Sequence, residues 1–166
     1  LNSNEEPPRD WKQFLSELRV HWEILQMQNN QLRERCIQDD LTGLLKYPAF
    51  CDQLKRHLKV QSQVAVMMLD IDDFKHINRL YGHLSGNNIL TFLSRILKQE
   101  LPMSGFLGRF GGDEFLIAFP CQSQLMLKAY CALLLQRIRQ SRFSLSDSGI
   151  SIKVSIGATL SMNDDN

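Results

Sequence analysis

The stretch Val64-Ala65-Val66-Met67-Met68-Leu69-Asp70-Ile71 decides how this chain is expected to fold. It is a nearly continuous apolar run with β-branched members, and such a run predicts a buried strand. Carboxylates gather where the run ends, because Asp72 and Asp73 follow Asp70 closely in the chain. We therefore predict a central strand with an acidic end.

The segments around this strand alternate between helical and extended patterns. Residues 47–59, 73–80, 84–100 and 122–139 have helical spacing of apolar side chains, whereas 106–109, 114–119 and 150–160 read as strands. Gly111-Gly112 between two of these strands predicts a hairpin. The resulting order, α-β-α-α-β-β-α-β, predicts an α+β fold in which helices cover a mostly antiparallel sheet.

Residues 10–38 precede this pattern and contain neither Gly nor Pro. Apolar residues recur there at alternating spacings of four and three, which is typical of a coiled-coil seam. A lone Asn at an a position favours two parallel strands in register, although an amphipathic helix packed on its own domain is the alternative. The seam consists of Leu15, Trp22, Asn29 and Cys36 at a, with Leu18, Leu25 and Leu32 at d.

Composition narrows the class of protein. The 166 residues suit one compact domain with a short extension, and 43% of them are hydrophobic. Nineteen basic and eighteen acidic side chains nearly cancel, which argues against a nucleic-acid partner or direct contact with an anionic membrane. No apolar run is long enough to span a membrane, and the four cysteines lack zinc spacing. We expect reduced thiols in a cytoplasmic protein.

Two acidic clusters point to chemistry: Asp70 at the strand end and Asp113-Glu114 at the hairpin. Carboxylates crowded in this way repel one another unless a cation lies between them. Mg²⁺ takes oxygen ligands, commonly one or two carboxylates together with substrate phosphates. Gly111 and Gly112 lack Cβ atoms, so a ligand can approach the backbone closely. These features predict a metal-dependent nucleotide site.

The segment Arg109-Phe110-Gly111-Gly112-Asp113-Glu114-Phe115 resembles the signature of the GGDEF family, the diguanylate cyclases. Four further segments resemble the same family in the same order, and together they cover about residues 39–160. They are Asp40-Leu41-Thr42-Gly43-Leu44, Asp70-Ile71-Asp72-Asp73-Phe74-Lys75, Asn78 with Gly82-His83-Leu84-Ser85-Gly86, and Val154-Ser155-Ile156-Gly157-Ala158.

The resemblance implies a fold like the palm of nucleotidyl cyclases and polymerases, which is ferredoxin-like. It implies condensation of two GTP into cyclic di-GMP and pyrophosphate by a homodimer that uses Mg²⁺ or Mn²⁺. Residues 1–38 would then be a linker and signalling helix, and 39–166 a GGDEF domain truncated at its C-terminus.

The resemblance also implies roles for individual residues. The metal ligands would be Asp70, Asp113 and the main-chain carbonyl of Ile71. Glu114 would lie beside the metal or the attacking hydroxyl, which makes Asp70, Asp113 and Glu114 the expected catalytic set. The expected substrate contacts are Asp73, Phe74 and Lys75 for the phosphates, Asn78 and Asn87 for guanine, and Gly111 and Gly112 for access.

Three departures from the family pattern keep a second reading open. Asn87 replaces the usual Asp that accepts from guanine, and an amide cannot accept both guanine hydrogens. Residues 102–105 lack the Arg and Asp of the product-inhibition motif. Nothing after Leu160 supplies the expected phosphate-holding helix and last strand. The alternative function is therefore a degenerate GGDEF domain that binds GTP or proteins as a regulator without turnover.

Overall fold

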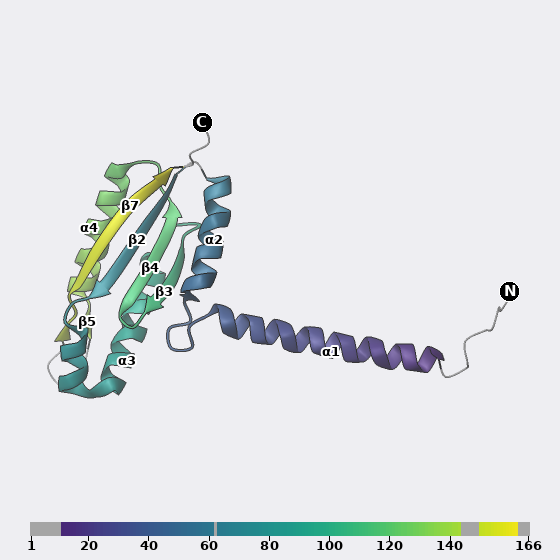
Figure 1. Ribbon diagram of the computed structural model, residues 1–166. Coiled ribbons are helices and arrows are strands. Elements are labelled where there is room, and N and C mark those ends of the chain that lie inside the picture. The colour runs from purple at the N-terminus through teal and green to yellow at the C-terminus, as the bar shows by residue number, and fades with distance from the viewer. Residues whose placement is uncertain (1–10, 62, 144–149, 163–166) are drawn as a thin grey trace. The chain divides into compact units, whose positions relative to one another are not determined.

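The computed structural model describes residues 11–61, 63–143 and 150–162. The chain divides into two units between Cys36 and Ile37, and each is described separately below. Figure 1 shows the arrangement of the elements within each unit. The helices are α1 (Trp11–Ile37), α2 (Tyr47–Val60), α3 (Phe74–Glu100) and α4 (Gln124–Gln140), and the strands are β1 (Leu45–Lys46), β2 (Gln63–Ile71), β3 (Phe106–Gly111), β4 (Glu114–Pro120), β5 (Arg142–Phe143), β6 (Ile150–Ser151) and β7 (Val154–Met162).

The apolar run forms β2, the second-last strand of a five-stranded sheet with the order β1-β3-β4-β2-β7. β2 pairs antiparallel with β4 on one side and with β7 on the other, whereas β1 and β3 pair in parallel. The fold-class prediction is confirmed: helices flank a sheet that is antiparallel apart from the short β1 edge. The predicted buried strand is confirmed as well, because Val64, Leu69 and Ile71 are almost fully buried.

The two faces of the sheet carry separate cores, because successive side chains of a strand point to opposite faces. On one face, Met67, Leu69 and Ile117 contribute to a large core that also contains buried residues of α3 and α4. On the other face, Phe50 of α2 packs in a smaller cluster with Leu116 and its neighbours. Figure 1 shows α2 beside β3 and β4, with β7 at the far edge of the sheet.

Part of the second face is open. An apolar groove of about 490 Å³ runs there between α2 and β7, and Met68 on its floor is 38% exposed. Tyr47 and Phe110 line one side of the groove, and their rings contact each other edge to face with 4.7 Å between the ring centroids. The end of β2 that carries Asp70 lies on this same face, because Met68 and Asp70 are two residues apart in the strand.

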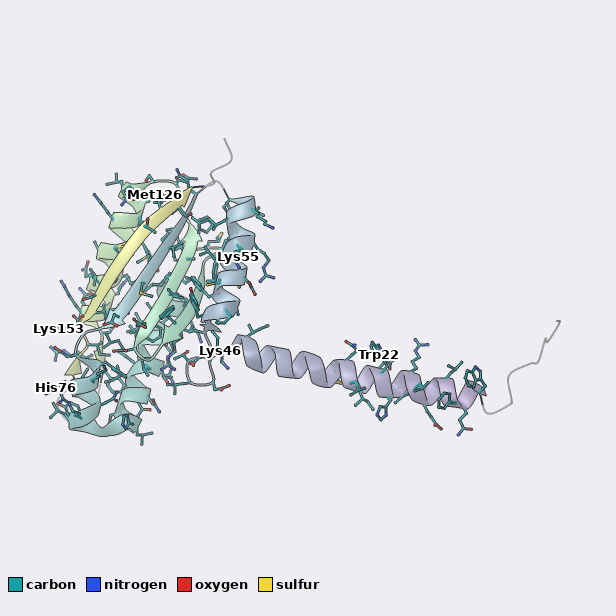
Figure 2. The ribbon with its side chains drawn as sticks, viewed as in Figure 1. Trp22, Lys46, Lys55, His76, Met126 and Lys153 are labelled. Atoms are coloured by element: carbon teal, nitrogen blue, oxygen red, sulfur yellow. The ribbon has the colours of Figure 1, made fainter. Side chains whose placement is uncertain are left out.

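α1 is one helix of 27 residues, which confirms the predicted helix. Its seam side chains are about half exposed, as Leu15, Leu18 and Leu25 illustrate at 49%, 49% and 51%. The Trp22 side chain, labelled in Figure 2, is 63% exposed. The side chains of Asn29, Leu32 and Cys36 lie outside the described residues. Pairing of this helix with a second copy stays a prediction.

One prediction about element boundaries was confirmed and another was wrong. The predicted break between residues 73–80 and 84–100 is confirmed, because α3 consists of two helical segments joined by a kink at Gly82, where φ is +81° and ψ is 159°. The predicted strand 150–160 is divided, because β6 pairs with β5 in a separate two-stranded sheet while β7 joins the main sheet. Ile152 lies at the break and is 1% exposed, so its inward orientation is as predicted.

The described parts of the chain also bear on membrane spans and on the state of the cysteines. No described helix combines the length and apolar character needed to cross a membrane. Among described side chains, Cys51, Cys121 and Cys131 are free thiols, in agreement with the expected reduced state.

Candidate functional site

The end of β2 places three polar side chains in one row across the sheet. Asp70 is the register partner of Glu114 on β4 and of Ser155 on β7. Directly opposite residues of an antiparallel pair have Cβ atoms about 4.5–5.5 Å apart and share a face. The sheet register therefore joins Asp70 and Glu114 on the open face, although 43 residues of sequence lie between them.

The β3–β4 hairpin carries Asp113 in a tight turn. Gly112 has φ of +31°, and the ladder is irregular between Arg109 and Gly111. A Cβ atom built on Gly112 would meet nothing within 4 Å, and one on Gly111 would meet only Glu114 Oε2 at 3.9 Å. The absence of side chains at both positions leaves open space at the hairpin tip.

The carboxylates at this end of the sheet act on one another. Partial burial raises the pKa of Asp70 above its ordinary value, and the charges of Asp113 and then Asp72 raise it further. Such repulsion is what a divalent cation between Asp70 and Asp113 would relieve.

The oxygen atoms at this site also fit a cation that completes its coordination with water or substrate phosphates. Within residues 11–61, 63–143 and 150–162, no three His, Cys, Asp or Glu side chains gather closely enough to enclose a metal by themselves. Two carboxylates and a main-chain carbonyl instead match Mg²⁺, which commonly retains waters and shares phosphate oxygens with a substrate. The carbonyl of Ile71, at the last residue of β2, is placed in sequence beside Asp70.

The link from β2 to α3 is held on its β7 side. The Asp72 amide donates to the Lys153 carbonyl at 3.0 Å, and the Ser155 hydroxyl donates to Asp72 Oδ1 at 2.7 Å. Figure 2 shows Lys153 and His76 at the same end of the domain.

The start of α3 is a turn with unpaired backbone donors. Asp73 adopts a left-handed conformation with φ of +56°, and its carbonyl accepts from the His76 amide at 2.8 Å. Phe74, 8% exposed, anchors the helix start in the core, and Lys75 is exposed. The first amides of a helix have no intrahelical acceptor, so the Phe74 and Lys75 N–H groups suit an anion.

Asn78 lies one turn into α3 with an unusual environment. Its Oδ1 atom is buried and accepts no hydrogen bond from any described residue. Gly86 makes room for it, because a Cβ atom there would lie 1.9 Å from that oxygen. Asn87 follows on an exposed part of the helix, where its carbonyl accepts from the Thr91 hydroxyl at 3.0 Å. The structure thus buries the Oδ1 atom of Asn78 beside Gly86 and leaves Asn87 on the surface.

Sequence reasoning missed the role of Arg109. Its guanidinium donates to the Gly112 carbonyl through Nε at 3.1 Å and Nη2 at 2.6 Å. Its Nη1 donates to both carboxylate oxygens of Asp39, at 3.0 and 3.2 Å. The arginine was quoted within the hairpin motif, but its partner is 70 residues away, so no local pattern could reveal the pair.

The turn before β1 is held by Asp39, which stands one residue before the motif that begins at Asp40. Asp40 itself is exposed. Asp39 Oδ1 accepts from the Thr42 amide at 2.9 Å and from the Thr42 hydroxyl at 2.6 Å. Partial burial alone would raise the pKa of Asp39, but the hydrogen bonds from Thr42 and Arg109 outweigh it and lower the pKa.

Comparison with known proteins identifies the domain. The family model described as "Diguanylate cyclase, GGDEF domain" matches residues 36–166. The chain belongs to the GGDEF domain family. The resemblance seen in the sequence is thereby confirmed.

Named relatives of this GGDEF domain include proteins of two kinds. Diguanylate cyclase DgcP of Pseudomonas aeruginosa is 30% identical over 131 residues, which are 76% of this chain and 20% of DgcP. Cyclic di-GMP phosphodiesterase PdeB of Shewanella oneidensis is 32% identical over 132 residues, 77% of this chain and 15% of PdeB. The chain therefore spans a fifth or less of the length of these two relatives.

A solved structure supports the fold of the GGDEF domain. The coiled coil and GGDEF domain of DgcB from Caulobacter crescentus, crystallised with c-di-GMP, matches with a TM-score of 0.81. That match has 21% sequence identity and covers 95% of this chain and 86% of the DgcB chain. At this identity the likeness concerns the fold.

Proposed function

We propose that this GGDEF domain is the output domain of a diguanylate cyclase, which condenses two GTP into cyclic di-GMP and pyrophosphate. In each of two steps, the 3′-hydroxyl of one nucleotide attacks the α-phosphorus of the other, and the bond to pyrophosphate breaks. The observation that carries this proposal is the sheet register that sets Asp70 opposite Glu114, the residue after Asp113, because such a set of carboxylates suits a cation and phosphates.

The proposed metal ligands are the carboxylates of Asp70 and Asp113 and the main-chain carbonyl of Ile71. Mg²⁺ or Mn²⁺ bound there would supply neutralisation of the charge that develops on the phosphates. Glu114, the register partner of Asp70, would orient the attacking hydroxyl or take up its proton.

The proposed substrate contacts come from α3 and the hairpin. Backbone amides of Asp73, Phe74 and Lys75 would hold phosphate oxygens at the helix start. The open space over Gly111 and Gly112 would admit the nucleotide.

We propose that guanine is read by two asparagines of α3. The buried Oδ1 of Asn78, which has no donor among the described residues, would accept a hydrogen bond from the base. Asn87 would form a weaker contact than the family's Asp, because an amide presents one acceptor and one donor group. We expect reduced GTP selectivity, with ATP accepted in one half-site.

The test of base selectivity is a comparison of turnover with GTP, with ATP and with an equal mixture. Asn87→Asp should restore preference for GTP by about 10- to 100-fold. Products that contain only guanine, formed by the unaltered protein at an unreduced rate, would refute the selectivity hypothesis.

We further propose that the active form is a homodimer assembled through α1, in the cytoplasm. Catalysis on two nucleotides needs two half-sites face to face, and the half-exposed seam of Leu15, Leu18 and Leu25 offers apolar surface for pairing. The solved DgcB chain likewise contains a coiled coil together with its GGDEF domain. Replacement of Leu18 and Leu25 by Glu should yield a monomer in sedimentation and abolish turnover.

The turn at residues 102–105 bears on product inhibition. The Gly105 amide donates to the Pro102 carbonyl at 2.9 Å, and a Cβ atom on Gly105 would lie 2.9 Å from that carbonyl. Neither an Arg nor an Asp stands in this turn, so no bidentate grip on product phosphates is available from it. We propose that cyclic di-GMP does not bind there tightly, and submicromolar binding by calorimetry would refute this.

The main experiment incubates the protein with GTP and Mg²⁺, followed by chromatography for cyclic dinucleotide. Asp113→Ala should abolish product. Asp52→Ala, which removes an exposed carboxylate paired with Lys55, should leave the rate unchanged. The relative named as a phosphodiesterase and the Asn87 departure favour a second candidate, a regulatory domain. GTP binding without product would select that candidate.

A further inference from the structure

Arg109 connects the β3–β4 hairpin with the turn at residues 39–44. Four donor–acceptor contacts leave its guanidinium, two to the Gly112 carbonyl and two to the Asp39 carboxylate. The side chains of Arg109 and Asp39 are only 14% and 21% exposed, so solvent screens this pair less than it screens a surface pair. A rigid guanidinium fork can satisfy both partners at once, which an ammonium cannot.

The Gly112 carbonyl is directly connected to Asp113. The carbonyl of one residue and the N–H of the next belong to one planar peptide unit. The two bonds from Arg109 therefore fix the plane from which the Asp113 side chain departs. Gly112 itself is permissive, because its positive φ and the open space around it impose little restraint. Arg109 therefore adds a restraint at the hairpin tip beyond the pairing of Gly111 with Glu114.

The Asp39 end of the pair is also anchored. Thr42 donates to Asp39 through its amide and its hydroxyl, and the Thr42 carbonyl accepts from Lys98 Nζ of α3 at 2.9 Å. In the next strand, Lys46 of β1 is the parallel register partner of Arg109. The turn at residues 39–44 thus connects the hairpin to the helix that carries Asn78.

We propose that Arg109 and Asp39 are positioning residues, which hold the Gly112–Asp113 peptide in the orientation that the Asp113 carboxylate needs for metal and nucleotide. This inference rests on the proposed function of Asp113. The competing explanation is that the pair only stabilises the turn at residues 39–44. Because Asp39 is the second residue after α1, the same pair would make the hairpin tip sensitive to the turn that follows that helix.

The test compares Arg109→Lys, Asp39→Asn and the double variant in the full chain. Arg109→Lys keeps the charge but cannot donate to both partners, and Asp39→Asn keeps the shape but loses the ion pair. Each single change should lower kcat and raise the Mg²⁺ concentration needed for half-maximal rate. The rate at a fixed, limiting Mg²⁺ concentration should fall about 10- to 100-fold, as is typical when support of a metal ligand is lost. The double variant should be no worse than Arg109→Lys, because both changes break one chain of contacts.

A matched control is available at Arg137, which pairs with Glu100 at 3.4 Å away from the carboxylates. Arg137→Lys should leave kcat and the Mg²⁺ requirement within about twofold, as expected for an exposed pair. Unchanged kcat and Mg²⁺ requirement in Arg109→Lys, with only a lower melting temperature, would overturn the positioning role in favour of the purely structural one.

A second readout separates this inference from the proposed function. Amide hydrogen exchange of residues 110–114, measured without nucleotide or metal, should accelerate in Arg109→Lys and Asp39→Asn but not in Arg137→Lys. If the unaltered protein makes no product, the proposed function fails, while faster exchange confined to the hairpin still supports the positioning of its tip. Exchange unchanged by both substitutions would refute the positioning role whatever the activity.

Discussion

Asn78→Ala should make the empty domain more stable and the nucleotide complex weaker. The Oδ1 atom of Asn78 is buried without a hydrogen-bond donor among the described residues, and Gly86 leaves it space without supplying a partner. A buried oxygen without a hydrogen bond opposes folding. The Asn78 amide therefore lowers the stability of the ligand-free domain unless a ligand donates to it. Its removal should raise that stability and lower the affinity for nucleotide.

The magnitude follows from three contributions. Relief of a buried unsatisfied acceptor stabilises by about 1–3 kcal/mol, and Ala in place of Asn inside a helix adds about 0.5 kcal/mol. Loss of the packing made by the carboxamide offsets about 1 kcal/mol of this gain. The net expectation is about 0.5–2.5 kcal/mol of added stability, which for a domain of this size is about 2–8 °C in melting temperature.

Asn88 on the same helix provides the control, because it is exposed. Asn88→Ala changes the same atoms but gains only the helix-propensity contribution, about 0.5 kcal/mol. The difference between the melting temperatures of the two variants, recorded without nucleotide, isolates the buried acceptor. GTP affinity, measured by calorimetry with Mg²⁺, should fall about tenfold or more in Asn78→Ala and stay unchanged in Asn88→Ala.

One result would refute this reasoning. Asn78→Ala could prove less stable than Asn88→Ala while binding GTP with unaltered affinity. The Asn78 amide would then have a structural partner and no part in base recognition, and the assignment of guanine reading to α3 would lose its main support.

Three further expectations concern packing, charge and capping. Gly108→Ala should destabilise by about 1–3 kcal/mol in urea unfolding, because its Cβ would lie 2.7 Å from Phe50 Cδ2. Asp113→Asn should raise the melting temperature of the metal-free protein at pH 7, because it removes a charge that raises the pKa of Asp70. A carboxyl with a raised pKa favours the folded state below that pKa and opposes it above, so this gain should disappear as the pH falls through the pKa of Asp70. Ser123→Ala should cost about 1 kcal/mol in thermal unfolding, because its hydroxyl caps α4 by accepting from a backbone amide at 3.2 Å.

Each of these has a contrary outcome. Gly157→Ala, where a Cβ would meet nothing within 4 Å, is the control for Gly108→Ala, and equal stability of the two variants would contradict the clash. A gain in Asp113→Asn that persists in acid would mean that repulsion of Asp70 is not its source. An unchanged melting temperature in Ser123→Ala would show that the α4 cap contributes nothing.

The sequence revealed those parts of the domain whose cause is local. The apolar run predicted β2, and the Gly pair between two strands predicted the hairpin, because side-chain period and turn chemistry are properties of adjacent residues. The break in α3 was predicted at the kink, because Gly82 interrupts the helical pattern. β1, β5 and β6 are two residues each, which is too short for any periodicity to appear.

The same distinction between local patterns and distant contacts applies to the candidate site. The motifs identified Asp70, Asp113 and Glu114 as candidates, and the sheet register placed Asp70 opposite Glu114. The pair of Arg109 and Asp39 was not predicted, because the two residues are 70 positions apart and are brought together only where β1 pairs with β3. A contact of this kind is decided by tertiary packing, and no spacing along the chain encodes it.

The two least favourable features of the empty domain lie where the ligand is proposed to bind. Repulsion of Asp70 by Asp113 opposes the empty state at neutral pH, and the unpaired oxygen of Asn78 opposes it at any pH. A cation would relieve the first and a guanine base the second, so each relief should add to the affinity of the ligand that provides it. Ligand at about 100 times its Kd stabilises by about 2.7 kcal/mol, whatever the contacts. Because Mg²⁺ would be shared by Asp113 and the substrate phosphates, Mg²⁺ should raise the affinity for GTP, and Asp113→Asn should remove that increase while Asn78→Ala should not.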